Sequence, residues 1–126
     1  MTEEDFYRIC EAEGIEIVWS DKKFSFYLCD PEFDIYCITL PKRRKGLRLL
    51  RDMFHELGHH FMHIGNDPAA AFSGLTDDRD ELEADAIALV AMIPKHMLKE
   101  MAFLDGSRFG DHLYNERIRL FFLYGI

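Results

Sequence analysis

The chain has 126 residues, 48% of them hydrophobic, enough to bury the core of one domain spanning residues 1–126. Its net charge of −8 argues against direct nucleic-acid binding, because phosphate contacts need a basic surface. The acidic N-terminus is no signal peptide, and the longest apolar run, residues 86–93, is too short for a membrane span. Cys10, Cys29 and Cys37 lack paired spacing and have apolar neighbours, so we expect buried or half-buried thiols, a cytoplasmic location and no membrane partner.

The first third of the sequence predicts a helix followed by three strands. Thr2 is a residue type that caps helix N-termini and Gly14 one that ends helices, so a short helix should lie between them. Residues 15–19 alternate between apolar and polar side chains, as half-buried strands do. Residues 24–29 and 34–40 then predict a hairpin of two further strands.

We expect an antiparallel register in this hairpin that pairs residue 28 with 35 and residue 26 with 37. Tyr27 and Tyr36 would then lie on one face of the sheet. The opposite face would be buried against a helix by five side chains: Phe24, Phe26, Leu28, Ile35 and Cys37.

Residues 46–63 predict one long helix. Gly58 lies inside it, where glycine costs about 1 kcal/mol relative to alanine. Its presence indicates that the backbone of another segment passes close by. Four apolar side chains at helical spacing should form the core stripe: Leu50, Phe54, Leu57 and Phe61.

Further helices should follow a loop at residues 67–76. Asp78, with Glu81 three residues on, is typical of a helix N-cap. Pro94 favours the start of another helix, and residues 111–124 predict a last one. Together these elements predict an α+β domain in which a small antiparallel sheet packs on a helical core.

The helix at residues 46–63 contains an H-E-x-x-H motif formed by His55, Glu56 and His59. Residues four apart share one helix face, so both imidazoles can bind the same metal ion. Neutral imidazoles suit zinc, and a neighbouring carboxylate can act as the general base of hydrolysis. The motif therefore predicts a zinc site with Glu56 as the catalytic base.

Such a site needs a third protein ligand. In the metzincin pattern the positions three and six residues after His59 would be glycine and histidine, but they hold Met62 and Gly65. His63 is eight residues from His55, roughly 12 Å of helix rise, and cannot join the same tetrahedron. The third ligand must therefore come from a second helix.

Glu81 and Asp85 are the carboxylates that this second helix offers. They share a face with Ala84 and Ala88, whereas Glu83 points about 200° away. Because small alanines allow close approach, we predict Glu81 as the third ligand, with Asp85 accepting the second ring N–H of a ligand histidine. The competing interpretation is an ordinary acidic first turn, with Glu81 in a capping box instead of on a metal.

Residues 49–64 and 81–94 resemble the ImmA/IrrE-type metallopeptidases, a family of the gluzincin group. The first stretch reads LLRDMFHELGHHFMHI. The second reads ELEADAIALVAMIP and is similar to the family's E-x-x-A-N/D-x-F-A-x5-P segment, with Ile87 at the Phe position. Phe54 stands where a small residue is common in the family, but none of these departures touches a predicted ligand.

The resemblance implies one zinc ion per chain at His55, His59 and Glu81 with Glu56 as base, in agreement with the spacing. It also implies an intracellular endopeptidase that acts on a protein or peptide, with DNA-binding repressors as usual targets. It further implies that the edge strand before the active helix, here residues 35–40, aligns the substrate. The first residues of that strand are Ile35, Tyr36, Cys37 and Ile38.

Two features stay open at the level of sequence. Hydrolysis usually needs a group that stabilises the tetrahedral oxyanion, and the candidates are His60, His63, Tyr36 and His112. The basic run at residues 42–45 is either a docking patch for an acidic partner or a solvated loop.

We therefore predict a zinc-dependent endopeptidase that cleaves a regulatory protein of the helix-turn-helix repressor kind. One alternative is a non-cleaving interaction module, zinc-bound or metal-free, that sequesters a regulator. Another is a hydrolase of non-peptide amides, because the zinc chemistry is indifferent to the origin of the acyl group.

Overall fold

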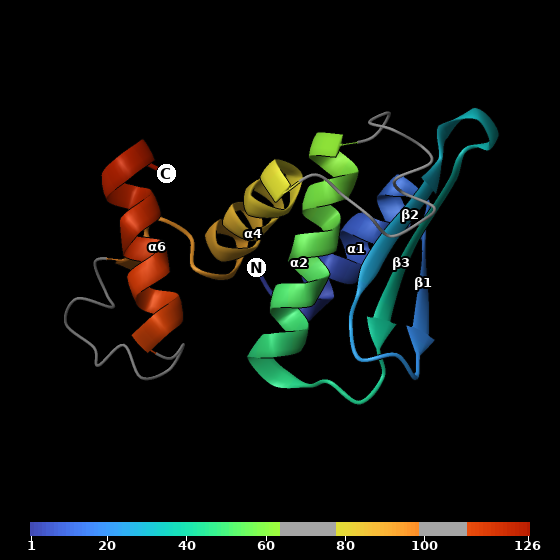
Figure 1. Cartoon of the computed structure of the whole chain (residues 1–126), viewed down its shortest axis with the longest axis horizontal. Helices are drawn as coiled ribbons and strands as arrows, with labels where there is room; N and C mark the ends of the chain where they lie inside the picture. Colours follow the sequence, from blue (N-terminus) through green and yellow to red (C-terminus); the bar gives the residue numbers. More distant parts are fainter. Residues whose placement is uncertain (64–77, 99–110) are drawn as a thin grey trace.

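The computed structural model describes residues 1–63, 78–98 and 111–126, with the side chains of residues 63, 78 and 111–114 outside that description. In Figure 1 the sheet lies to one side of α2, α4 lies to the other, and α6 lies beyond α4. None of the described helices combines the length and the apolar character that crossing a bilayer requires. The elements in chain order are α1 (Glu3–Glu13), β1 (Ile15–Ser20), β2 (Phe26–Asp30), the 3₁₀ turn η1 (Pro31–Phe33), β3 (Ile35–Pro41), α2 (Gly46–His63), α4 (Asp78–Met92) and α6 (Asp111–Tyr124).

Local sequence signals determine where α1 begins and ends. The Thr2 side chain accepts from the backbone N–H of Asp5, and the Asp5 carboxylate accepts from the backbone N–H of Thr2, which forms a capping box. Gly14 ends the helix with a φ of 71°, in the left-handed region that glycine adopts without strain. The first predicted helix is therefore confirmed at both ends.

The predicted α+β class is confirmed, but the sheet is mixed instead of fully antiparallel. Its strand order is β1-β3-β2, with β1 parallel and β2 antiparallel to β3. The last residues of β3, from Ile38 to Pro41, are all buried, as expected for a strand with neighbours on both sides. β3 is therefore the middle strand.

The predicted substrate-aligning edge strand is thus wrong. It contains Ile35, Tyr36, Cys37 and Ile38, and all four residues belong to β3. Tyr36, Cys37 and Ile38 pair with β1 on one side and β2 on the other, and Ile35 pairs with Asp30 of β2, so this stretch is not an edge strand. The edges of the sheet within the described residues are β1 and β2.

The predicted hairpin register was also wrong, by two residues. Leu28 pairs with Cys37 and Tyr27 with Ile38. The buried face carries Tyr27, Cys29 and Ile38, whereas Phe24 and Ile35 are 60% and 56% exposed. A shift of two residues leaves the two faces of the hairpin composed as predicted, but the face that is buried is the one that carries Tyr27. That face packs on α2, where the Tyr27 hydroxyl meets a buried partner, His60, which an apolar side chain could not satisfy.

Helix α2 separates two packing layers. Its buried Leu49, Met53, Phe54 and Leu57 join one core cluster with residues of the sheet and of α1 and α4. Phe61, predicted in the core stripe, is exposed, whereas its neighbour His60 is buried against β2. Of the thiols, Cys10 and Cys29 are buried and Cys37 is intermediate, as predicted.

Helix α6 is attached through a buried cation. Arg117 is fully buried, and its guanidinium donates to the carbonyl oxygens of Ile93 and Ile126.

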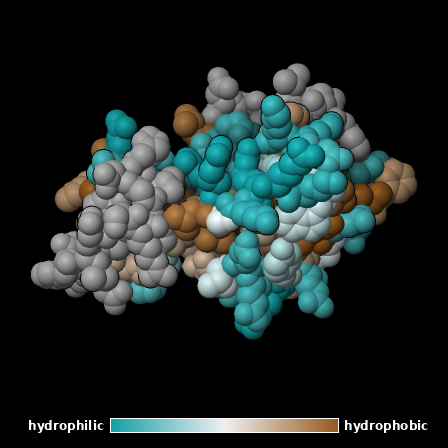
Figure 2. Space-filling view, turned by 90° about the horizontal axis from the view of Figure 1, so that it is seen from below, coloured by the Kyte–Doolittle hydropathy of each residue, from teal (hydrophilic) through white to brown (hydrophobic). Residues whose placement is uncertain are grey.

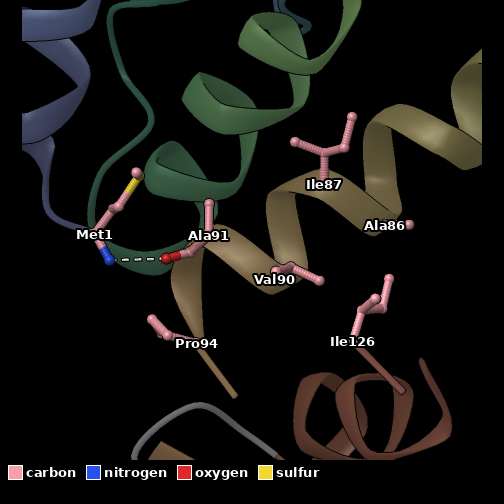
Figure 3. Close-up of a pocket in the computed structure, with 7 residues that line it drawn as sticks. All are labelled: Met1, Ala86, Ile87, Val90, Ala91, Pro94 and Ile126. Carbon is pink, nitrogen blue, oxygen red and sulfur yellow. Dashed lines mark hydrogen bonds between the residues drawn. The ribbon is translucent and has the colours of Figure 1, made fainter. Parts of the chain in front are cut away.

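Figure 2 shows hydrophilic side chains over much of one face of the molecule, with hydrophobic side chains beside them. An apolar pocket of about 470 Å³ is drawn in Figure 3 and is lined by Met1, Ala86, Ile87, Val90, Ala91, Pro94 and Ile126.

The sequence predicted that another backbone passes close to Gly58, and the structure confirms this prediction with helix α4. A Cβ at this position would lie 3.1 Å from the Ala84 Cα and 3.4 Å from the Ala84 Cβ. Ala84 and Ala88 are fully buried on the facing side of α4. Three small residues therefore allow the two helix backbones to come close.

We expect Gly58→Ala to lower the stability of the protein by about 1 kcal/mol. Overpacking against a backbone atom costs about 1–3 kcal/mol, and the helix propensity of alanine returns about 1 kcal/mol. Thermal unfolding of the variant and the wild type measures the difference. A raised melting temperature would show that α4 can move away without loss.

Candidate metal centre

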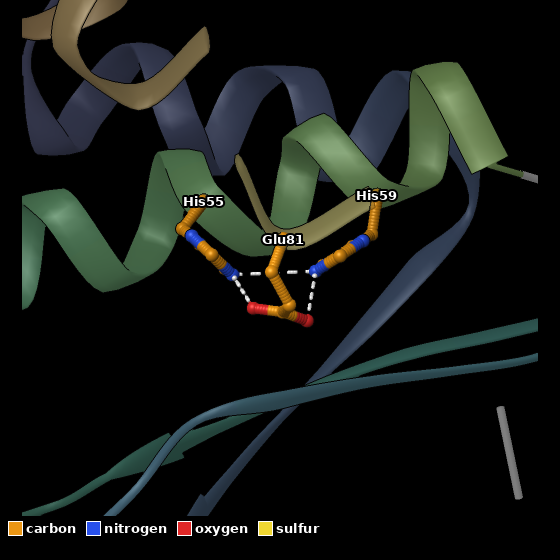
Figure 4. A group of neighbouring side chains, drawn as sticks. All are labelled: His55, His59 and Glu81. Atoms are coloured by element: carbon orange, nitrogen blue, oxygen red, sulfur yellow. Dashed lines mark hydrogen bonds and ion pairs between the residues drawn. The ribbon is translucent and has the colours of Figure 1, made fainter. Parts of the chain in front are cut away.

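Three side chains from two helices meet at one point between α2 and α4. His55 and His59 project from successive turns of α2, and Glu81 reaches them from the first turns of α4 (Figure 4). Glu81 Oε2 lies 2.8 Å from His55 Nε2, and Glu81 Oε1 lies 3.0 Å from His59 Nε2. The ligand atoms of the three residues all lie within 4.8 Å of one another.

This donor set has the geometry and chemistry that a divalent metal requires. The two Nε2 atoms are 3.2 Å apart. In tetrahedral coordination at about 2.0–2.1 Å, two ligand nitrogens lie roughly 3.3 Å apart. Two imidazoles and one carboxylate form a ligand set that zinc accepts while leaving a fourth position open. The two histidines therefore have the spacing that a metal ion requires, and Glu81, 2.8 and 3.0 Å from them, completes the ligand set after a small outward shift of its carboxylate.

Asp85 determines how the His55 ring is oriented. Its Oδ1 lies 2.7 Å from His55 Nδ1, so the ring donates its Nδ1–H to the carboxylate and directs Nε2 at the cluster. Burial lowers the pKa of His55, but the Asp85 hydrogen bond and the charges of Glu56, Asp85 and Glu81 outweigh it and raise this pKa to about 9. The surplus of negative charge around His55 is what a bound cation would neutralise.

Glu56 lies on the neighbouring face of α2 and is only 3% exposed. Its Oε1 is 3.9 Å from His55 Nε2 and accepts a hydrogen bond of 3.1 Å from the Ser25 hydroxyl. Burial raises the pKa of Glu56 to about 7, against the lowering effects of His55 and Ser25. A carboxyl group with such a pKa can both accept and release a proton near neutral pH.

The position of Glu81 favours the metal interpretation over the capping interpretation. Its two carboxylate oxygens face the two histidines. Glu83, on another face of α4, pairs with Arg79 at 3.1 Å instead. The side chain of Asp78, the predicted N-cap, lies outside the described residues.

Two of the four oxyanion candidates lie elsewhere. His60 is buried, with Nδ1 2.7 Å from the Tyr27 hydroxyl and Nε2 3.2 Å from Glu13 Oε2, so both its nitrogens have partners. Tyr36 packs its ring against His60, with ring centroids 5.1 Å apart. One helical residue rotates the side chain by about 100°, which is why His60 faces the sheet while His59 faces Glu81.

The other two candidates, His63 and His112, have side chains outside the described residues, as do the loop at residues 67–76 and most of the helix predicted after Pro94. Sequence reasoning missed Ser25, because a single serine in a polar stretch carries no signal of the helix that it will meet.

Two of the four basic residues before α2, Lys42 and Arg44, form ion pairs within the molecule. Lys42 Nζ lies 2.7 Å from Asp21, and Arg44 lies 2.6 Å from Asp52 and also donates to the backbone of Lys23. These contacts anchor the connection between β3 and α2. Arg43 and Lys45 of the same run are exposed and would be the cations of a docking patch.

Comparison with known proteins identifies the family. The Peptidase_M78 family, described as the IrrE N-terminal-like domain, matches residues 10–108, which is more than half of the chain. The chain therefore belongs to this family of metallopeptidase type, and the predicted ImmA/IrrE-type relationship is confirmed. No curated protein and no solved structure matches the chain.

Replacement of a ligand residue should remove the metal. We expect about one zinc per chain in the wild type and little in His55→Ala, His59→Ala or Glu81→Gln, because two remaining donors bind zinc poorly. Glu83→Gln is the matched control on the same helix and should keep the metal. Elemental analysis that finds full zinc in Glu81→Gln, with loss in Glu83→Gln, would contradict the ligand assignment.

Loss of the Asp85 carboxylate should weaken zinc binding without unfolding the protein. Removal of a partner that orients a ligand histidine typically costs about 10–100-fold in metal affinity, and we expect this range for Asp85→Ala. Competition with a chelating dye gives the affinity, and circular dichroism reports the fold. An affinity equal to that of the wild type would leave Asp85 without a role at the metal.

Proposed function

We propose that this protein is a zinc-dependent endopeptidase. The observation that carries the proposal is the triad His55, His59 and Glu81, with the buried carboxylate of Glu56 beside it. Family membership supports peptide hydrolysis as the reaction class. Two imidazoles and a carboxylate support zinc as the metal.

Each residue of the site has a separate role in hydrolysis. A zinc ion at this triad supplies Lewis-acid chemistry, polarising a carbonyl oxygen and lowering the pKa of water. Glu56 accepts a proton from the attacking water and later delivers it to the leaving amine. Asp85 holds His55 in the tautomer that presents Nε2 to the cluster. Burial of Glu56 keeps bulk water from competing for its proton.

The substrate would align on β2. This strand is an edge of the sheet, and Ser25, directly before it, contacts Glu56. An extended peptide can add to a free edge through backbone hydrogen bonds, which orients its scissile bond relative to fixed side chains. β2 therefore takes the role that sequence reasoning gave to β3.

We propose a regulatory protein, a helix-turn-helix repressor, as the substrate and the cytoplasm as the location. Both follow from the resemblance to the ImmA/IrrE-type peptidases. The net charge of −8 supports recognition of the repressor itself in preference to its DNA. We further propose that residues 1–126 act as one domain with one zinc ion.

Glu56→Gln tests catalysis separately from binding. The amide is nearly isosteric but accepts no proton at neutral pH, and general-base catalysis contributes about 10²–10⁴-fold. We therefore expect zinc content and thermal stability close to those of the wild type, with cleavage reduced by that factor. The variant serves as bait to capture a substrate from lysate, and cleavage of the captured protein is then measured.

Glu83→Gln is the control for the same chemical change and should cleave like the wild type. Cleavage that survives zinc removal, or equal cleavage by Glu56→Gln, would rule out the proposal. Tight binding by both proteins with no cleavage by either would establish the sequestering module instead. Turnover of a small non-peptide amide with no cleavage of proteins would establish an amidohydrolase.

A further inference from the structure

A second set of contacts joins α2 to β2, on the helix face next to the metal cluster. The Ser25 hydroxyl donates to Glu56 Oε1 at 3.1 Å. The Tyr27 hydroxyl lies 2.7 Å from His60 Nδ1. We call these two hydrogen bonds the β2 clamp. One bond ends on the proposed catalytic base and the other on the residue that follows the ligand His59.

The spacing of the clamp fits both elements. Glu56 and His60 are four residues apart in a helix, which is about 6.0 Å of rise. Ser25 and Tyr27 are two residues apart in extended chain, which is about 6.6–6.8 Å. The two bonds therefore form together when strand and helix run in the same direction. A slip of one residue would turn both hydroxyls to the opposite face of the sheet.

Burial makes this register hard to lose. Tyr27, Glu56 and His60 are all buried. Glu13 of α1 pairs with the second nitrogen of His60 at 3.2 Å, so the ring is held between a strand and a helix. A buried polar group that loses its partner carries the full penalty of desolvation. Any other register of β2 would leave such groups without partners.

We propose that Ser25 and Tyr27 are positioning residues for the hydrolysis, and this inference rests on the proposed function. Among the residues that the structure describes, Ser25 is the hydrogen-bond donor to the Glu56 carboxylate. It holds the same oxygen that lies 3.9 Å from His55 Nε2. Ser25 fixes the rotation of the base, and Tyr27 keeps the strand in the register from which Ser25 reaches it.

The clamp has a consequence for the substrate. Because β2 is an edge strand, a peptide that pairs with it takes its register from β2. The same strand is bonded to the base, so the scissile bond and the Glu56 carboxylate are placed by one element. A shift of β2 along α2 would move the peptide relative to Glu56 and break the Ser25 bond, so the clamp holds the scissile bond and the base in one relative position.

Amide hydrogen exchange tests the clamp independently of any activity. Ser25→Ala and Tyr27→Phe should each raise exchange in residues 26–30 by about fivefold, the effect of losing one hydrogen bond that resists local opening. Residues 15–20 of β1 serve as the internal reference and should not change. Ser20→Ala and Tyr7→Phe are the matched controls, since the Ser20 hydroxyl accepts from the Lys22 backbone N–H and Tyr7 lies exposed on α1.

Steady-state kinetics test the positioning role. The probe is a fluorescence-quenched peptide chosen from a random mixture for cleavage by the zinc-loaded wild type. Ser25→Ala should lower kcat about tenfold at unchanged KM and zinc content, because its bond goes to a charged carboxylate. Ser25→Thr keeps the hydroxyl and should restore kcat. Tyr27→Phe should lower kcat about threefold, and the double variant should match Ser25→Ala, since Tyr27 acts through Ser25.

The outcomes separate this inference from the proposed function. Unchanged exchange in residues 26–30 of the double variant overturns the clamp, whatever the activity. Faster exchange with unchanged kcat overturns the positioning of Glu56. Failure of the wild type to cleave any peptide contradicts both the proposed function and the positioning role. Hydrogen exchange alone then decides whether the clamp exists.

Discussion

The close approach of α2 and α4 is the constraint on which the site depends. A glycine on one helix faces an alanine on the other, and a Cβ at Gly58 would lie only 3.1 Å from the Ala84 Cα. The glutamate side chain is short. Glu81 can therefore reach between His55 and His59 only because the two helix backbones are this close. Packing of small side chains, an apolar interaction with no chemistry of its own, therefore positions the polar donors. Bulkier residues at this crossing would separate the carboxylate from the imidazoles.

The site also shows how charged groups are tolerated beside a hydrophobic core. His55, Glu56 and Asp85 are each at least half-buried by their neighbours, and each has a specific partner: Asp85 for His55 and Ser25 for Glu56. Carboxylates outnumber cations around the cluster, which raises the pKa of His55 although burial alone would lower it. A site with such an excess of negative charge is stabilised when a metal binds, because the ion replaces a proton and neutralises the excess charge.

The sequence predicted those parts of the site that depend on short-range periodicity. The positions of His55 and His59 follow from the four-residue spacing, and Gly58 signalled a close helix because a buried glycine has few other reasons to stand there. The order and the register of the strands could not be predicted from this periodicity. Phe24, Leu28 and Ile35 are as apolar as the residues that are buried, so hydropathy gave no reason to choose the face that carries Tyr27. That face is selected by a hydrogen bond to His60, a contact between elements more than thirty residues apart.

Two adjacent histidines of α2 illustrate why residue type alone assigns no role. His59 and His60 are adjacent in sequence and equally buried, yet one faces Glu81 and the other faces Tyr27. The difference is the rotation of about 100° between successive helical residues. Helix α2 therefore presents its metal donors to α4 and its strand contacts to β2, with Glu56 on the second of these faces. The base is thus supported by the sheet while the metal donors are supported by the helix pair, and the two supports can be altered separately.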